Sequence, residues 1–282
     1  MSFDFYSDLA EERKSARGVD EGVLFKEEAC GPFVKTRLTI ETENAARLLE
    51  RPKGHYFSLA FPSPLLLDEE SGALLAKEAA TLLRELAPQA AKRLLVVGLG
   101  NRHMTADAVG PTVAEGVFPT AHLPKPAEPT FASRAHSVSV FIPGVRAQSG
   151  MDAKDAVSAL CKAFSFDFVL AVDALAAKSP ARLLRTVQIS DTGISPGSLF
   201  GGEQKTLSFA SLGVPVLSLG VPTVISAAAL VNKESEADGA FSEHKASSVV
   251  PEDFFVSPKT LDAELSLLSP LLSDAINLAF GM

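Results

Sequence analysis

The chain has 282 residues, of which 46% are apolar and 21% are charged, and its formal net charge is −8 at pH 7. This length and apolar fraction are typical of a folded protein with a large core and exclude a disordered chain. The acidic balance argues against direct nucleic-acid binding, because phosphate contacts need a basic face. Cys30 and Cys161 stand outside any C-x-x-C pattern, which fits a reducing compartment.

No secretory signal or membrane span is predicted. The N-terminal stretch MSFDFYSDLAEERKSARG has acids before bases and no apolar centre, unlike a secretory signal. The uncharged stretch 206–232 is long enough to cross a bilayer, but two Gly-Val-Pro breaks, ending at Pro215 and Pro222, would interrupt a membrane helix. We expect instead a strand at Pro215–Leu219, a turn and a helix from about Thr223, in a cytosolic protein.

Residues 1–68 are expected to form an N-terminal β-rich extension with a candidate propeptide at its start. The segments GVLFKEE, FVKTRLTIE and GHYFSLAFP alternate between apolar and polar residues, as antiparallel strands do. A helix is predicted over Glu69–Leu86, where leucines recur on one side. This helix opens the predicted α/β core, residues 69–231.

Apolar runs and helix-like stretches alternate through this core. Three runs predict buried parallel strands at 93–100, 166–174 and 214–220, with companions at 137–143 and 182–190. Helices are predicted at Asp107–Val117, Asp152–Phe164 and Thr223–Val231. The alternation predicts an α/β fold, a three-layer sandwich around a mostly parallel or mixed sheet. A surface loop at 122–134, a mobile polar loop at 232–248 and C-terminal helices at 249–282, divided by Pro270, complete a single domain over residues 1–282.

Two short motifs in the stretch QISDTGISPGSLFGG suggest rival active sites. Asp191-Thr192-Gly193 matches the triplet of pepsin-like proteases, but those need two such loops in an all-β fold, and this chain has one copy in a βα pattern. Ser195 lies in a G-x-S-x-G match, yet the next residue is Pro196, which lacks the N–H that a hydrolase oxyanion hole requires. We interpret both motifs as turns.

Acidic residues follow three of the predicted strands. Asp107 follows the first buried run after GLGN, Asp173 ends the second, and Asp191 follows the companion run LLRTVQIS. Ligands of parallel α/β sheets bind beyond the carboxyl ends of the strands, so the three acids are expected at one edge. Two close carboxylates can share a proton and act as general acid and base, or can hold a metal with a third ligand. Each acid alone could equally be a helix cap or a turn former.

The stretch Gly98-Leu99-Gly100-Asn101 does not predict a dinucleotide site. The third glycine of G-x-G-x-x-G is replaced by His103, and no acid ends an early second strand in the right register. A glycine pair after a strand more often permits close passage of the backbone.

Four blocks, in order, resemble the germination protease family: VVGLGNRHMTADAVGP, FIPGVRAQSGMDAKD, FDFVLAVDALAAKSPARLLRTVQISDTGISPGS and LGVPVLSLGVPTVISAA. The resemblance extends from YSDLAEE near the N-terminus to FFVSPKTLDAELSLLSPLLSDAINLAF at the other end. These are aspartic-type spore endopeptidases that degrade small acid-soluble spore proteins during germination, and they are similar in fold to hydrogenase-maturation peptidases.

The resemblance implies a role for individual residues. The family's proposed catalytic pair falls on Asp107 in the G-L-G-N…T-P-D block and on Asp173 in the I-D-A-L-A block. Four residues are expected to shape the site: Asn101, Asp191, Gly100 and Gly193. The resemblance further implies a zymogen trimmed near its N-terminus, a homotetramer, and a place in the cytoplasm of a spore core. No cofactor, metal, direct nucleic-acid partner or membrane partner is expected.

The chain departs from the family pattern in several places. Thr105-Ala106-Asp107 replaces T-P-D, GGEQK replaces a basic G-N-K-R-K run, and the segment before the terminal helices is shorter. YSDLAEE lacks the arginine of the family's R-T-D-L-A, so no processing site is assigned.

Other readings stay open at this point. A metal-dependent hydrogenase-maturation-type peptidase would need a downstream histidine, and none lies between His136 and His244, although His103 could substitute. A catalytically inactive paralogue that binds a partner is a second alternative, against which both acids argue. Peptidyl-tRNA hydrolases also begin with G-L-G-N, but the acidic charge fits their substrate poorly.

Overall fold

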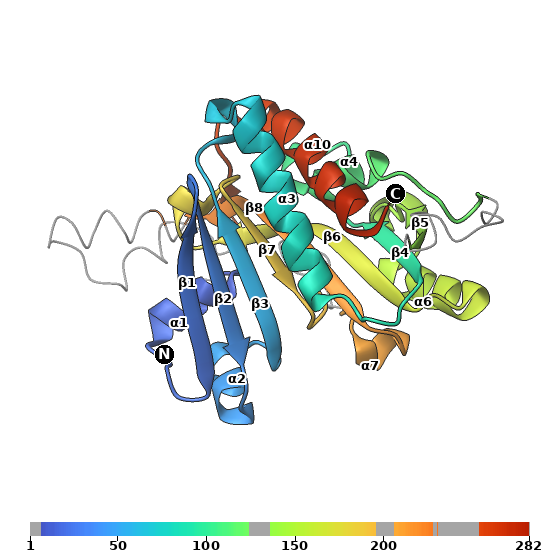
Figure 1. The fold of residues 1–282 in the computed structure, drawn as a ribbon, viewed down its shortest axis with the longest axis horizontal. Coiled ribbons are helices and arrows are strands. Elements are labelled where there is room, and N and C mark those ends of the chain that lie inside the picture. Colours follow the sequence, from blue (N-terminus) through green and yellow to red (C-terminus); the bar gives the residue numbers. More distant parts are fainter. Residues whose placement is uncertain (1–6, 124–135, 196–205, 228–229, 231–253, 282) are drawn as a thin grey trace, which may run out of the picture.

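Helices cover both faces of one mixed β-sheet (Figure 1). The computed structural model describes residues 7–123, 136–195, 206–227, 230 and 254–281. The nine strands of the described sheet run in the order β1-β2-β3-β7-β8-β6-β4-β5, and β9 pairs with β8. The predicted fold class, a three-layer α/β sandwich, is confirmed.

The centre of the sheet is parallel, as its continuous apolar runs predict. The parallel strands are β4 (Arg93–Gly98), β5 (Ser137–Phe141), β6 (Phe168–Ala177) and β8 (Val216–Ser226). Every residue of β6 and β8 is buried. Strands buried on both faces lack polar alternation, which is why these segments read as uninterrupted apolar sequence.

The N-terminal extension continues this sheet in antiparallel fashion. Its strands are β1 (Val23–Cys30), β2 (Phe33–Ile40) and β3 (Gly54–Ala60). β3 pairs with β7 (Thr186–Ser190), and β7 pairs with β8, both in antiparallel register. The β-rich character predicted for residues 1–68 is therefore confirmed, and β7 is the strand that joins extension to core.

Each face of the sheet has its own helices. The front face in Figure 1 carries α3 (Glu69–Leu86), α4 (Val109–Glu115) and α10 (Leu261–Phe280), which share the largest apolar cluster with the sheet. The other face carries α6 (Ala153–Phe164) and α7 (Phe209–Leu212), with α1 (Ala10–Arg17) and α2 (Glu43–Leu49) below the extension. Shorter elements are η1 (Pro64–Leu66), η2 (Thr105–Asp107), α5 (Arg146–Ser149), η4 (Pro180–Arg182) and β9 (Phe255–Val256).

Two predictions about prolines are wrong. β8 does not turn into a helix at Thr223 but continues as a strand to Ser226, because its register to β6 shifts beside Pro222 and no regular ladder bond is required there. Helix α10 is not divided at Pro270, because apolar residues on both sides of the proline are buried in the cluster that includes α3: Leu265, Leu268, Leu272 and Ile276.

Helices α1 and α2 were not predicted. The predicted loops at 122–134 and 232–248 lie mostly or wholly outside the described residues, as does the GGEQK stretch. No helix in the described ranges is both long and apolar enough to cross a membrane.

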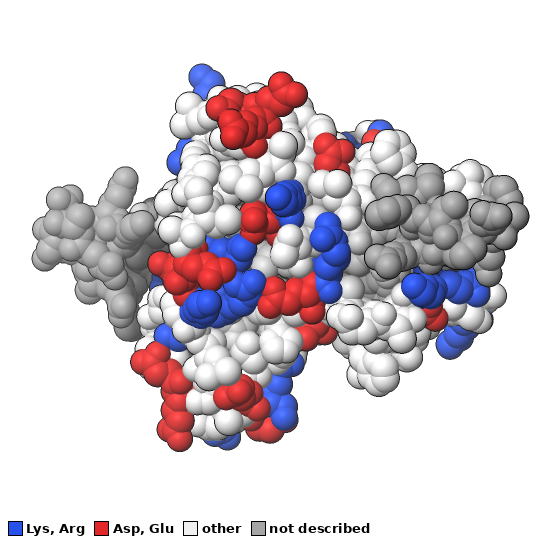
Figure 2. Space-filling view, viewed as in Figure 1, with Lys and Arg blue, Asp and Glu red and all other residues white. Residues whose placement is uncertain are grey.

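Acidic and basic side chains are interspersed on the face that carries α3 and α10 (Figure 2). Arg37 of β2 lies 2.8 Å from Glu28 and 2.9 Å from Glu85, and Lys35 pairs with Glu78 of α3. The basic side chains of β2 are therefore matched by acids of β1 and α3.

Candidate active site

The turn that carries Asp107 follows β4 and is built around a tight loop. The backbone N–H of Asn101 donates to the Asp107 carboxylate at 2.9 Å and to its carbonyl at 3.0 Å. Gly100 has φ +107°, and a Cβ there would lie 2.2 Å from the Asp107 carbonyl oxygen. Only glycine fits this left-handed, crowded position, so Gly100 is required for the conformation of this turn. Asp107 itself is buried, with 6% of its surface exposed.

Asp173 lies on β6, one residue beyond the part of that strand that pairs with β4. Its neighbours Val172 and Ala174 belong to the cluster under α3 and α10, so strand alternation turns the Asp173 side chain to the other face. The carboxylate accepts the Ala174 N–H at 2.9 Å, and 4% of the residue is exposed. Asp173 is thus a nearly dry carboxyl group at the centre of the sheet.

The two carboxyl groups differ in acidity. Burial raises the pKa of Asp107 to about 6, although the Asn101 N–H opposes the rise. Burial raises the pKa of Asp173 well above its usual value, and the charges of Asp107 and Asp8 raise it further. Burial therefore favours the protonated form of both carboxyl groups, compared with an exposed aspartate. Two neighbouring carboxyl groups of which one is ionised and the other protonated can supply a general base and a general acid together.

A second loop is tied to the Asp107 turn through Asn101. The Asn101 side-chain oxygen accepts from Gln148 at 2.8 Å and from the His103 N–H at 3.0 Å. Gln148 lies in α5, in the loop after β5, so the loops that follow two neighbouring parallel strands are fastened together. Gln148 was not singled out from the sequence, and only its place in the FIPGVRAQSGMDAKD block could have indicated it.

The expectation that Asp191 joins the other two acids is wrong. β7 runs antiparallel to β8, so its last residue, Ser190, lies opposite Ser218, whereas Asp173 lies opposite Gly220. Asp191 therefore lies toward the amino-terminal ends of the parallel strands, whereas Asp107 and Asp173 lie toward their carboxyl ends. Its carboxylate accepts the His55 N–H at 2.8 Å instead.

A cavity of about 210 Å³ extends along the sheet from Gly220, which pairs with Asp173, to the turn that follows Asp191. Leu175, Gln188, Ser218 and Gly220 line it from the sheet, and Gly193 lies in its wall. Gly193 has φ +86°, and a Cβ there would lie 2.1 Å from the Leu207 carbonyl oxygen, so this turn requires glycine. The cavity is on the Asp173 side of the sheet, since Leu175 and Asp173 point to the same face.

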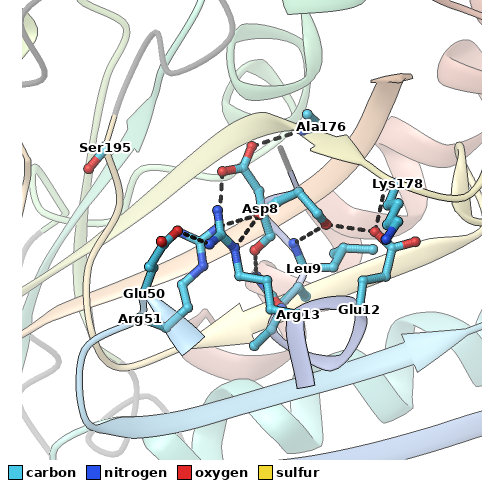
Figure 3. Close-up of polar contacts among 12 residues, drawn as sticks. Asp8, Leu9, Glu12, Arg13, Glu50, Arg51, Ala176, Lys178 and Ser195 are labelled. Carbon is cyan, nitrogen blue, oxygen red and sulfur yellow. Dashed lines mark hydrogen bonds and ion pairs between the residues drawn. The ribbon is translucent and has the colours of Figure 1, made fainter. Parts of the chain in front are cut away.

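The segment before α1 lies on β6 at Ala176, three residues after Asp173 in the sequence (Figure 3). The Asp8 N–H donates to the Ala176 carbonyl at 2.9 Å, and the Ala176 N–H donates to the Asp8 carboxylate at 2.9 Å. Leu9 is fully buried in an apolar cluster with Leu175, Ala177, Leu183 and Ile225. The N-terminal segment is therefore held on β6 by one backbone hydrogen bond, one hydrogen bond to a carboxylate and a buried leucine side chain.

Side chains hold this segment from both ends. Arg51 donates to the Ser7 carbonyl at 2.8 Å and to the Asp8 carboxylate at 3.1 Å. The Glu12 carboxylate accepts the N–H groups of Lys178 and Ser179 at 2.6 and 2.9 Å. Ser195, the serine of the rejected elbow motif, lines the same cavity as Asp8 and Arg51 but has no drawn polar contact with them (Figure 3). Neither Asp8 nor Arg51 was identified from the sequence.

Comparison with known proteins assigns the family. A family model described as germination protease matches residues 4–236. This chain belongs to the germination protease family. The resemblance seen in the sequence blocks is thereby confirmed, and both Asp107 and Asp173 fall within the matched region.

Individual members of the family align over most of the chain. A germination protease from Bacillus cytotoxicus is 36% identical over 236 residues, 82% of this chain and 64% of that protein. One from Caldanaerobacter subterraneus subsp. tengcongensis is 32% identical over 284 residues, 92% of this chain and 88% of that protein. The chain thus spans just under two thirds of the Bacillus germination protease and most of the Caldanaerobacter one.

A solved structure, the hydrogenase maturation protease HycI from Thermococcus kodakarensis, has a TM-score of 0.38 and 16% identity over 70% of this chain and 99% of that one. Within the described residues of this family member, no three His, Cys, Asp or Glu side chains are grouped so that they could hold a metal ion.

Proposed function

We propose that this chain is an aspartic-type endopeptidase that degrades small acid-soluble spore proteins when a spore germinates. The observation that carries the proposal is the buried carboxyl pair, Asp107 and Asp173, whose pKa values are both raised and whose charges interact. Membership of the germination protease family supports the substrate class.

In the proposed reaction Asp107 is the general base and Asp173 the general acid. Ionised Asp107 takes a proton from water as the water oxygen bonds to the scissile carbonyl carbon. Asp173 then gives its proton to the amide nitrogen as the C–N bond breaks and the oxyanion of the tetrahedral intermediate re-forms a carbonyl. Transfer of a proton from Asp107 to Asp173 restores the starting pair. Such transfers contribute about 10²- to 10⁴-fold each when the group is held in place.

We further propose that residues before α1 keep the enzyme in a zymogen form. What supports this is their hydrogen bonding to β6, three residues from Asp173, and the buried Leu9 side chain. A substrate peptide laid along β6 would meet the same backbone groups of Ala176. Trimming of this segment would free that edge. The homotetramer and the spore-core location are part of the same proposal.

The test is cleavage of a purified small acid-soluble spore protein by wild type, Asp107→Asn and Asp173→Asn, each with and without EDTA. Asp167→Asn is the matched control, since Asp167 caps the start of β4 through the N–H groups of Lys92 and Arg93. We expect both active-site variants to lose activity and the control to keep it, whether or not EDTA is present.

Two outcomes would overturn the proposal. Loss of wild-type activity in EDTA would favour a metal-dependent peptidase. Absence of wild-type activity, both in the intact protein and after removal of residues up to Leu9, would favour a binding protein without catalysis.

A further inference from the structure

The pairing of β6 with β8 contains an irregularity next to the active site. Leu175 pairs with Pro222 and Ala176 pairs with Val224, so Thr223 is an extra residue on β8. A bulge of this kind re-aims one side chain and bends the strand locally. It lies two residues after Asp173 on β6, in the part of the sheet that extends beyond the end of β4.

The bulge directs the Thr223 hydroxyl at the Asp107 turn. Thr223 Oγ1 donates to the Ala106 carbonyl oxygen at 2.6 Å, and no part of Thr223 is exposed. Ala106 immediately precedes Asp107, so this bond fixes the peptide that carries the proposed base. Residues 106 and 223 are far apart in sequence, and the bulge is what brings the hydroxyl within reach.

A second contact holds the same turn from the other side. The Thr105 hydroxyl donates to Asp262 of α10 at 2.7 Å. Thr105 and Asp262 are exposed at that bond, whereas Thr223 is fully buried. The hydrogen bond of Thr223 therefore restrains the turn more strongly than that of Thr105, because water cannot replace either partner in a buried site.

We propose that Thr223 is a positioning residue that sets the place of Asp107 relative to Asp173. β8 is the strand beside β6, so one hydroxyl on β8 ties the turn after β4 to the strand that bears Asp173. The expected effect of Thr223 on the cleavage rate rests on the proposed peptidase function. Its expected effect on the titration of the Asp107 carboxyl group rests on geometry alone.

Three variants test the hydroxyl separately from packing. Thr223→Val keeps the shape and β-branching but removes the donor, and Thr223→Ser keeps the donor. Thr186→Val is the matched control, because Thr186 is equally buried in β7 and its hydroxyl has no partner among the described residues. Folding of each variant is checked by thermal unfolding before any comparison.

Two readouts are measured for each variant. Steady-state cleavage of a small acid-soluble spore protein gives kcat and KM, and carbon NMR of labelled aspartate gives the titration of Asp107, assigned with Asp107→Asn. Misplacing a catalytic group by about 1 Å lowers the rate on the order of 10²-fold, so Thr223→Val should lose roughly that factor in kcat with KM little changed. Its Asp107 titration should move, and Thr223→Ser should match wild type in both readouts.

The inference is overturned if Thr223→Val matches Thr186→Val in kcat and in the Asp107 titration, or if Thr223→Ser is as impaired as Thr223→Val. An inactive wild type counts against the proposed function only, and the NMR titration then decides the positioning role by itself.

Discussion

Replacing Asp107 with asparagine should make the protein inactive and, at neutral pH, more stable. The folded state holds the Asp107 proton more tightly than the unfolded chain does, because burial raises the pKa from 3.8 to about 6. As pH rises from about 4 to 6, the unfolded chain therefore gives up this proton first, and the folded state loses stability. Asp107→Asn removes the charge and keeps an oxygen that can accept the Asn101 N–H.

The expected size of this effect follows from the pKa difference. One pKa unit corresponds to about 1.4 kcal/mol, so ionised Asp107 lowers the free energy of unfolding by about 3 kcal/mol at pH 7.5. At pH 4.5 most of the penalty has gone, and linkage leaves about 1 kcal/mol. The gain from Asp107→Asn should therefore be about 2 kcal/mol larger at pH 7.5 than at pH 4.5.

Urea unfolding of wild type and Asp107→Asn at the two pH values measures this difference. Asp167→Asn serves as the control of opposite sign, since backbone N–H groups of Lys92 and Arg93 lower the pKa of Asp167. That variant should be destabilised at pH 7.5 relative to wild type. A gain for Asp107→Asn that is the same at both pH values, or no gain at all, would refute the burial of a charged Asp107.

Other measurements follow from the same site. Cleavage by the trimmed enzyme should rise with pH through about 6, as Asp107 ionises, and a rate that is flat from pH 5 to 7 would contradict its role as base. Gly100→Ala should abolish activity and lower the unfolding temperature, whereas Gly150→Ala, at φ +73° with no atom near its Cβ, should keep activity. Arg51→Ala removes two hydrogen bonds from the N-terminal segment, which should lower the free energy of opening this segment by about 1.5–3 kcal/mol. Amide hydrogen exchange at Asp8 should therefore become at least about tenfold faster. Unchanged exchange would show that Arg51 does not hold the segment.

The central strands and the burial of Asp107 and Asp173 next to them could be predicted because burial leaves a strong local pattern. β4 and β6 are uninterrupted apolar runs, and an acid at the end of such a run is conspicuous. Asp191 follows a similar run, β7, but the direction of that strand is fixed by its antiparallel neighbours β3 and β8. No local pattern shows the direction of a strand, so the sequence could not show that Asp191 lies away from Asp107 and Asp173.

The N-terminal segment could not be predicted for a different reason. Helix α1 is short and mostly charged, and its buried Glu11 is matched by Arg182, a partner far along the chain. The bulge at Thr223 is equally non-local, because it exists only in the register between β6 and β8. Features that depend on pairing between distant segments leave no periodicity in either segment.

The contact between Thr105 and Asp262 also bears on the order of events during synthesis. The two residues are separated by 157 positions, and Asp262 lies in the last described helix, α10. Contacts between distant segments form late, since a long loop must first be closed. On a ribosome the whole sheet emerges before α10 does, so the Asp107 turn is fastened on both sides only at the end of folding. The arrangement of the Asp107 turn described above therefore depends on α10 having been synthesised and packed onto the sheet.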